Sequence, residues 1–321
     1  MHASLMTGVT VSMLAAMTAI SHAQTAYPNK PIRLIVGFTA GGPTDGPARK
    51  IADDVGKALG QTVVVENKPG AGGKIALEYV LSQPRDGYTL LLCTYIDVIN
   101  TVLYKKVSYS LSDIEPISTI TRGYYVLSVG QSVPANTIGE FIDYAKSKQG
   151  QLNYGQVGAG SQPELITRQF GQMTKVDMTS IAYRGTAEAV RDLISGNIQF
   201  LVGPLQVTMP LVQSKQLKAL AVTSPERLAA APDVPTLKEQ GIPLVSYGWL
   251  GVCGAKGIDA AILQRLNREV VTAVASPGYR TLVETNGVIP LSSTQAEMTA
   301  IMEETARDSG KIIRELGLTQ D

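Results

Sequence analysis

Two glycine-rich loops carry the residue types that could bind a ligand. In VGFTAGGPTDGPARK, residues 36–50, an apolar run ends in a loop with two glycines, two threonines and one acid before a helical pattern begins. In GQVGAGSQP, residues 155–163, glycines, a serine and a proline follow a second strand-like run. Glycines allow close approach to the backbone, and helix N-termini with free N–H groups favour anions. The loops therefore predict a site for an acidic ligand, bound mainly by main-chain amides.

The first 23 residues have the features of a secretory signal peptide. They contain no Lys, Arg, Asp or Glu, are apolar from about Leu5 to Ile20, and end in the small-x-small cleavage pattern Ser21-His22-Ala23. An uncleaved anchor is the less favoured interpretation, because the apolar run is shorter than the ~20 residues of a membrane span. We expect export and removal of residues 1–23.

Cleavage would remove both histidines, His2 and His22. Without histidine, Ser-His-Asp and Cys-His nucleophiles, imidazole bases and His-containing metal sites are excluded. The two cysteines, Cys93 and Cys253, are too few for a Cys-rich metal site. Both lie in apolar stretches, which is compatible with buried free thiols and with a disulfide formed after export, and the sequence alone does not choose between the two. No metal, cofactor or catalytic residue is predicted.

The charge pattern argues against nucleic acid as a partner. The formal net charge is +1, both signs are spread evenly, and there is no basic stripe.

Apolar runs alternate with helical patterns along the 321 residues, a length that suits two domains. The expected strands are 32–36, 62–65, 89–93, 125–129, 152–156, 179–183, 198–202, 217–222 and 247–253. The expected helices are 48–59, 75–81, 137–146, 163–173, 187–194, 260–275 and 294–315. This βαβ order predicts an α/β fold in which each domain is a mostly parallel sheet flanked by helices. Crossings near 118–124 and 223–235 predict a discontinuous first domain, 24–122 with 230–321, and an inserted second domain, 123–229.

The glycine runs do not match nucleotide-binding motifs. Around residues 70–75, Ile75 replaces the Ser or Thr of a Walker A loop and Lys68 its first glycine. In the second loop Pro163 occupies the place of the third glycine of a dinucleotide fingerprint. In open α/β sheets ligands bind outside the carboxyl ends of strands. Loops from two domains would then face each other across a cleft.

Individual candidates follow from side-chain chemistry. The hydroxyl groups of Thr39 and Thr44 could donate to a carboxylate, or alternatively satisfy their own backbone. Asp45 is expected chiefly to cap its helix, because two carboxylates repel. Ser161 is the matching cap or ligand donor in the second loop. Arg184 could contact a second carboxylate, the alternative being a solvated loop arginine.

Aromatic side chains near the strand ends could supply flat walls. Tyr95 and Trp249 are the candidates, although an aromatic residue more often belongs to a core. The complete predicted ligand-binding set is Phe38, Thr39, Ala40, Gly41, Gly42, Thr44, Asp45, Tyr95, Gln156, Gly160, Ser161, Gln162, Tyr183, Arg184 and Pro204.

Ordered sequence blocks spread over the full mature chain resemble the Bug family, the TctC-like periplasmic solute receptors of tripartite tricarboxylate transporters. The blocks are Tyr27-Pro28-Asn29-Lys30-Pro31-Ile32-Arg33, Gly41-Gly42-x-x-Asp45 with Ala48-Arg49, Glu66-Asn67-Lys68-Pro69-Gly70-Ala71-Gly72-Gly73, Asp86-Gly87-Tyr88-Thr89-Leu90, Gly158-x-Gly160-Ser161, Tyr183-Arg184-Gly185, Ala219-Leu220-Ala221-Val222-Thr223, Pro232-Asp233-Val234-Pro235-Thr236 and Trp249-x-Gly251. The resemblance implies a periplasmic two-domain Venus-flytrap protein that closes on a small carboxylate through main-chain amides and ordered water. It also implies the membrane subunits of such a transporter as partners. We expect a monomer.

Departures from the family pattern bear on the ligand. Gly37 and Thr39 stand where the family often has prolines, Gln156 replaces a frequent Ser, and Glu164 a frequent His. The candidate ligands are aliphatic di- or tricarboxylates and aromatic carboxylates of the terephthalate type. A receptor that reports to a signalling kinase is the first alternative. An exported α/β hydrolase is the second, but it would lack both histidine and a Gly-x-Ser-x-Gly elbow.

Overall fold

The computed structural model describes residues 27–148, 150–158, 160–183 and 185–320. The predicted signal peptide, residues 1–23, and Arg184 of the predicted binding set lie outside the described residues.

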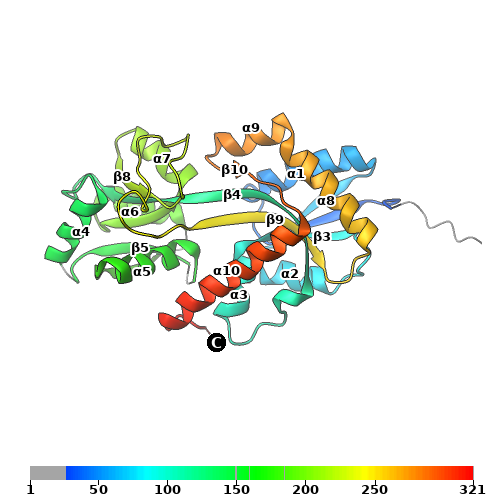
Figure 1. Cartoon of the computed structure of the whole chain (residues 1–321), viewed down its shortest axis with the longest axis horizontal. Helices are drawn as coiled ribbons and strands as arrows, with labels where there is room; N and C mark the ends of the chain where they lie inside the picture. The colour runs from blue at the N-terminus through cyan, green and yellow to red at the C-terminus, as the bar shows by residue number, and fades with distance from the viewer. Residues whose placement is uncertain (1–26, 149, 159, 184, 321) are drawn as a thin grey trace, which may run out of the picture.

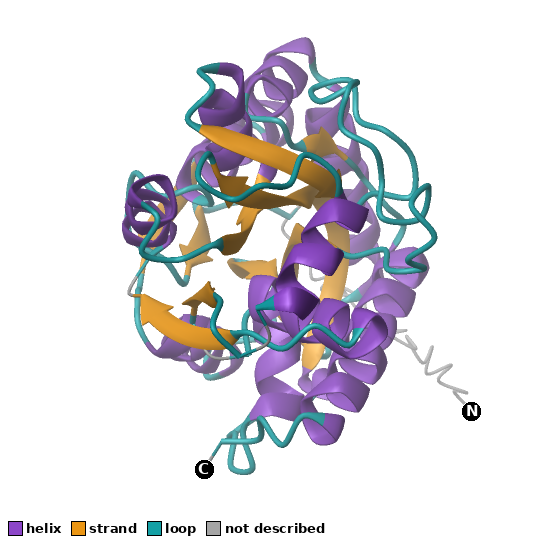
Figure 2. Ribbon diagram, turned by 90° about the vertical axis from the view of Figure 1, so that its left-hand side faces the viewer, coloured by secondary structure: helices purple, strands orange, loops and turns teal. Residues whose placement is uncertain are grey.

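The first lobe combines the parallel strands β1 (Ile32–Val36), β2 (Val63–Asn67) and β3 (Thr89–Thr94) with the antiparallel strands β9 (Tyr247–Ala255) and β10 (Ile289–Pro290), and helices cover this sheet (Figure 1). Its helices are α1 (Asp45–Leu59), α2 (Lys74–Leu81), α3 (Tyr95–Leu103), α8 (Ala260–Ala275), α9 (Pro277–Thr285) and α10 (Gln295–Glu315), with short 3-10 turns η1 (Ala71–Gly73) and η2 (Leu111–Asp113). The layers of helices and strands are also seen in Figure 2. Buried side chains of α1, α8 and α9 pack on one face, and those of α2, α3 and α10 on the other.

The second lobe repeats this layering with the middle of the chain. Its strands are β5 (Asn153–Val157), β6 (Thr179–Tyr183), β7 (Phe200–Pro204) and β8 (Leu217–Val222). Its helices are α4 (Ile138–Ser147), α5 (Gln162–Thr174), α6 (Thr186–Ser195) and α7 (Leu205–Gln213). Phe141, Phe170 and Phe200 form a fully buried stack at its centre, with ring centroids 4.9 to 6.4 Å apart.

One long strand, β4 (Ile114–Gly130), joins the two lobes. Up to Tyr124 it pairs with β9, and from Tyr125 onward it pairs with β7 and β8. The sheet order is β2-β1-β3-β9-β4-β7-β5-β6, with β8 and β10 also paired to β4. In Figure 1 β4 leads from the first lobe into the second, and β9 leads back beside it.

The predicted α/β class with two domains of mostly parallel strands is confirmed, and most of the expected strands and helices match within a few residues. Three helices, α3, α7 and α9, were not expected. The sequence of α3, YIDVINTVL, is rich in β-branched and aromatic residues, and α7 has Pro210 inside it. Both features disfavour helix locally, so tertiary packing overrides propensity at these two segments.

The predicted domain limits, 24–122 with 230–321 and 123–229, stay a prediction, because the strands that cross between the lobes do not show where one domain ends. Ala231, Leu237, Ile242 and Leu244 pack with the clusters of the second lobe, before the chain returns through β9. In the part of the chain that the structure describes, no helix has the length and apolar character needed to cross a membrane.

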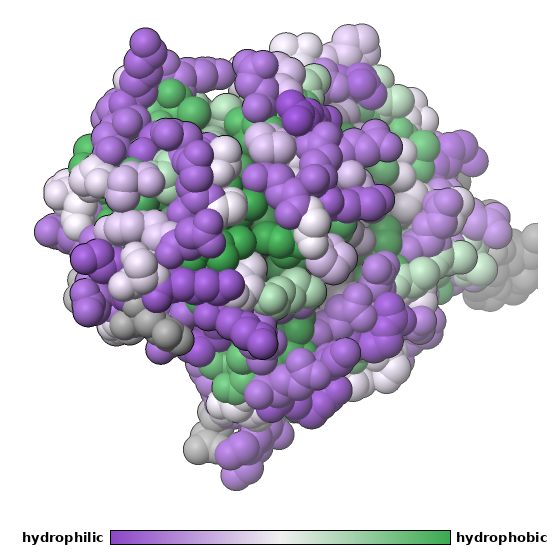
Figure 3. Space-filling view, turned by 60° about the vertical axis from the view of Figure 1, so that its left-hand side comes forward, coloured by the Kyte–Doolittle hydropathy of each residue, from purple (hydrophilic) through white to green (hydrophobic). Residues whose placement is uncertain are grey.

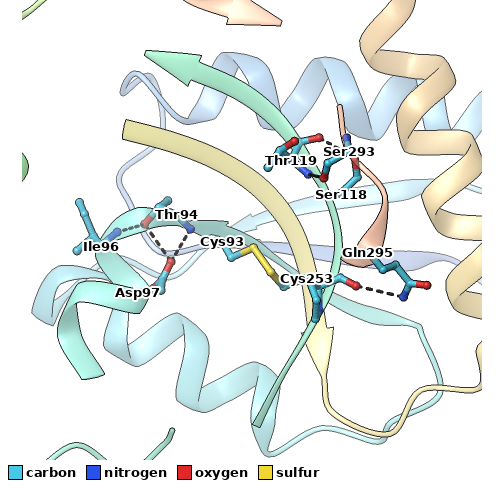
Figure 4. The surroundings of a disulfide bond; sticks show 10 residues. Cys93, Thr94, Ile96, Asp97, Ser118, Thr119, Cys253, Ser293 and Gln295 are labelled. Carbon is cyan, nitrogen blue, oxygen red and sulfur yellow. Dashed lines mark hydrogen bonds between the residues drawn. A yellow bond between two sulfur atoms is a disulfide. The ribbon is translucent and has the colours of Figure 1, made fainter. Parts of the chain in front are cut away.

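Cys93 and Cys253 form a disulfide bond between β3 and β9 (Figure 4). Their Cα atoms lie 5.9 Å apart on adjacent antiparallel strands, and both side chains are buried. Of the two alternatives that the sequence left open, the structure decides for the disulfide, and the expected burial is confirmed. An apolar sequence context indicates burial, but only the strand order places two cysteines 160 residues apart in contact.

Candidate functional site

Strand directions place the carboxyl ends of the two sheets opposite each other. Strand β9 is antiparallel to both β3 and β4, so β1, β2 and β3 run in the direction in which β4 enters the second lobe. Strand β7 is antiparallel to β4 and parallel to β5, which is parallel to β6, so these three run back toward the first lobe. The loops that follow β1 and β5 therefore face each other, as expected for ligand loops of an α/β receptor.

The first loop is held by a buried carboxylate. Asp45, the first residue of α1, accepts hydrogen bonds from the Gly41 N–H at 3.1 Å and from the Asn67 side-chain amide at 3.0 Å. Arg49 binds the same carboxylate through Nε at 2.8 Å and Nη2 at 3.1 Å. Asn67 also donates to the Phe38 carbonyl oxygen at 3.0 Å. The expected cap role of Asp45 was wrong, because its side chain binds the loop and not the free amides of its helix.

The second loop is held in the same way. The Gly160 N–H donates to Glu164 Oε2 at 2.7 Å, and Arg168 Nε donates to Glu164 Oε1 at 2.9 Å. Ser161 is the N-cap of α5 and accepts from the Glu164 N–H at 3.5 Å, so its predicted cap role is confirmed. The Glu164 side chain is only 1% exposed.

Sequence reasoning missed this shared arrangement, although its signal is present in the chain. Gly41, Asp45 and Arg49 have the spacing of Gly160, Glu164 and Arg168, with an acid four residues after a glycine and an arginine four residues after the acid. On a helix the last step, i to i+4, places two side chains side by side. The glycine belongs to the loop, and so only the folded loop reveals that its N–H reaches the acid.

A second group of candidates lies where the chain crosses between lobes. Tyr125 donates from its hydroxyl to that of Tyr95 at 3.3 Å, and Tyr125 is paired with Pro204 across β4 and β7. The Gln162 side chain donates to Ser246 Oγ, one residue before β9 begins. The structure thus places Tyr95, Gln162 and Pro204 around the crossing strands.

Other predicted residues bind inside their own lobe. Gln156 accepts from Ser180 Oγ at 3.0 Å, and the Tyr183 hydroxyl donates to Asp192 at 2.6 Å. Trp249 is 2% exposed and donates from Nε1 to Thr305, so the core alternative holds for this aromatic residue. The Thr44 hydroxyl oxygen is buried, and among the described residues it has no hydrogen-bond partner, so its own backbone does not satisfy it.

Contacts between the lobes fix the position of the second loop. A Cβ atom at Gly160 would lie 2.6 Å from Leu103 Cδ2, which shows that α3 of the first lobe packs directly against this loop. Leu103 also belongs to an apolar cluster with Ile99, Leu165 and Ile313, drawn from α3, α5 and α10. The surface in Figure 3 shows apolar residues in a hollow between polar rims.

A separate surface depression of about 620 Å³ lies between α1 and the edge strand β2. It is lined by residues that include Arg49, Asp53, Lys57, Val63 and Val65. It contains no residue of the predicted binding set, and we assign the site to the facing loops.

Residues 47–318 match the family described as "Tripartite tricarboxylate transporter family receptor". The chain belongs to this receptor family. Among relatives of the receptor, a "UPF0065 protein in gbd 5'region" from Cupriavidus necator is 34% identical over 308 residues, covering 96% of this chain and 93% of that protein. Protein BugT from Bordetella pertussis is 31% identical over 295 residues, covering 91% and 90%. The resemblance to the Bug family is confirmed.

Solved structures support the same assignment. A structure described as a periplasmic transporter is similar to the receptor with a TM-score of 0.80 and 30% identity, covering 92% of this chain and 100% of that one. An R. palustris protein solved with adipate has a TM-score of 0.79 and 30% sequence identity, covering 91% of this chain and 98% of that one. MatC from Rhodopseudomonas palustris with bound malate has a TM-score of 0.76 and 27% sequence identity, covering 89% of this chain and 100% of that one. The receptor therefore has the two-domain fold of periplasmic binding proteins.

Two aspartates near the loops of the receptor have pKa values shifted in opposite directions. Hydrogen bonds from Arg49 lower the pKa of Asp45 from 3.8 to about 2. Burial raises the pKa of Asp97, in α3, from 3.8 to about 6, although Thr94 donates to its carboxylate from N–H and hydroxyl (Figure 4). By linkage, Asp45 contributes stability above about pH 4 that is lost as the pH falls toward 2, whereas Asp97 contributes stability below about pH 4 that is lost as the pH rises through about 6.

Asp97→Asn is expected to flatten the pH dependence of stability between about pH 4 and 6. At pH 7 the variant should be more stable than the wild type by about 3 kcal/mol, because it no longer buries an ionised carboxylate, and the gain should vanish near about pH 4. Urea unfolding at pH 4, 5, 6 and 7 measures this, with Asp45→Asn as a control that should lower the free energy of unfolding by a nearly constant amount at pH 5, 6 and 7. Identical wild-type and Asp97→Asn profiles would contradict the shift.

Proposed function

We propose that the receptor captures a small carboxylate between the loops that follow β1 and β5, and delivers it to the membrane subunits of a tripartite tricarboxylate transporter. The observation that carries this proposal is the pair of facing loops, each anchored by a glycine, an acid and an arginine at the start of a helix. Helix N-termini and loop amides favour anions. The adipate and malate bound to two R. palustris proteins of the same fold support this ligand class.

The proposed contacts come from both lobes. In the first lobe they are the loop from Phe38 to Asp45 and the ring of Tyr95; in the second they are Gln156, Gly160 to Gln162, Tyr183, Arg184 and Pro204. The Thr44 hydroxyl has no hydrogen-bond partner within the part of the chain that the structure describes, and it is therefore the best-supported side-chain donor. The Tyr183 hydroxyl already donates its hydrogen bond to Asp192, so we propose that Tyr183 forms a wall of the site and does not donate to the ligand.

The proposed mechanism is capture without catalysis, in the periplasm after removal of the signal peptide. An open form admits the acid to one loop, rotation at the crossings near Tyr124–Tyr125 and Ser246–Tyr247 brings up the other loop, and the closed form is recognised by the membrane subunits. Both aliphatic di- and tricarboxylates and aromatic acids of the terephthalate type fit this proposal, since amide donors require only the carboxylate.

Thermal-shift measurements on the protein from residue 24 onward test the proposal. The panel contains malate, adipate, citrate, benzoate and terephthalate, with the uncharged diamide of adipate as the matched control. At a hundredfold excess over Kd, a bound acid should stabilise the fold by about 2.7 kcal/mol. The diamide should give no shift. A panel in which no acid stabilises the protein, or one acid is chemically converted, would overturn the receptor proposal.

A further inference from the structure

We propose that Asp45 and Glu164 are positioning residues of the binding cleft, and that Arg49 and Arg168 screen their negative charge from an anionic ligand. The inference rests on the proposed capture of a carboxylate, and it explains how loops without a basic ligand-binding side chain of their own can be held ready for one.

The same geometry occurs at the start of two helices in different lobes, α1 after β1 and α5 after β5. In each loop a glycine N–H donates to a carboxylate four residues later, at 3.1 Å for Asp45 and 2.7 Å for Glu164. In each helix an arginine four residues further on binds that carboxylate, at 2.8 and 2.9 Å. The exposed pair Asp53–Lys57 has the same helical spacing but binds no loop amide. Both of the facing loops therefore carry an anchor, by which we mean this arrangement of glycine N–H, carboxylate and arginine.

Because the carboxylates of Asp45 and Glu164 are buried, each one needs hydrogen-bond donors from the protein. The carboxylates of Asp45 and Glu164 are 8% and 1% exposed, while Arg49 and Arg168 are 52% and 33% exposed. A buried carboxylate must find hydrogen-bond donors, and the glycine N–H is one that the helix itself does not supply. Gly41 and Gly160 have φ angles of 76° and 71°. A loop with such glycines has many alternative conformations, and the carboxylate selects one of them.

A loop ordered before binding costs the ligand less conformational entropy. The anchor provides that order, but it places a negative charge beside a site for an anion. Like charges within a few ångströms repel, and the arginine offsets this repulsion from the solvent side of the carboxylate. Loss of the acid and loss of the arginine should therefore have different consequences for binding.

Amide hydrogen exchange tests the positioning role without any ligand. In Asp45→Ala, peptides covering residues 38–45 should exchange about tenfold faster, because the Gly41 N–H loses its acceptor. Asp45→Asn keeps an acceptor oxygen and should exchange like the wild type, and Asp53→Ala is the matched control on the same helix. Glu164→Gln and Glu164→Ala repeat the comparison for residues 158–165, the Gln variant guarding against loss of the fold. Unchanged exchange in both alanine variants would overturn the proposal.

Calorimetric titration with adipate, and then with the other acids of the panel, tests the screening role. Arg49→Gln leaves the Asp45 charge uncompensated and should weaken binding about tenfold. The double variant Asp45→Asn, Arg49→Gln carries neither charge and should recover most of the wild-type affinity, a rescue that a purely structural role for Arg49 would not produce. Equal losses in the single and double variants would overturn the screening role. If no acid binds the wild type, the proposed function fails, while the exchange experiment still decides the positioning role.

Discussion

Replacing Cys93 and Cys253 together with alanine is expected to lower the free energy of unfolding by about 2–5 kcal/mol. The disulfide closes a loop of 160 residues, so it restricts the unfolded chain strongly. It also joins β3 to β9, one residue before the Thr94 cap of α3. The variant should therefore lose stability without losing the strand pairing that places Tyr95.

Urea unfolding of the wild type and the double alanine variant measures this loss. Reduced wild-type protein is the control: it should unfold at a lower urea concentration than the oxidised form, whereas reductant should not change the double variant. Equal stability of oxidised wild type and double variant, with no effect of reductant on either, would mean that the cysteines are free thiols.

Gly160→Ala is expected to lower the free energy of unfolding by about 2–4 kcal/mol, and to weaken binding of the panel acid that stabilises the wild type most. Two costs add. The φ angle of 71° is unfavourable for a residue with a Cβ atom, and that atom would lie 2.6 and 2.8 Å from the two Leu103 methyl carbons. Relief of this clash must move the second loop away from α3.

Gly158→Ala is the matched control for this prediction. Gly158 has a similar φ of 82°, but a Cβ atom there would be 3.7 Å from its nearest neighbour, Ser161 Cβ. Gly158→Ala should lower the free energy of unfolding only by the cost of placing a Cβ atom at a positive φ angle, about 1–2 kcal/mol. Adding Leu103→Ala to Gly160→Ala should restore part of the lost affinity. Equal losses at positions 158 and 160 would show that contact between the lobes does not position the loop.

The sequence predicted the strands and loops well where local pattern and burial agree. Val36 and Val157 end strands at the positions that their apolar runs indicate within one residue, and the glycines and prolines after them mark the helix starts. It failed where tertiary contacts override local preference. The β-branched segment of α3 is helical because Val98, Ile99 and Leu103 pack against α2, α5 and α10. The role of Asp45 was predicted wrongly, since an acid at a helix start is equally compatible with capping and with anchoring a loop.

The sequence by itself determined the receptor family, the α/β class and the two loops at the ends of strands, because these depend on residue types and short spacings. Only the tertiary structure decided that the loops face each other, that Cys93 meets Cys253, and that Gly160 packs on Leu103. These facts depend on strand order and direction across the long strand β4, which connect residues far apart in the chain. For Glu164, the sequence shows an acid four residues after Gly160 and four before Arg168, and only the structure shows that its carboxylate binds both residues.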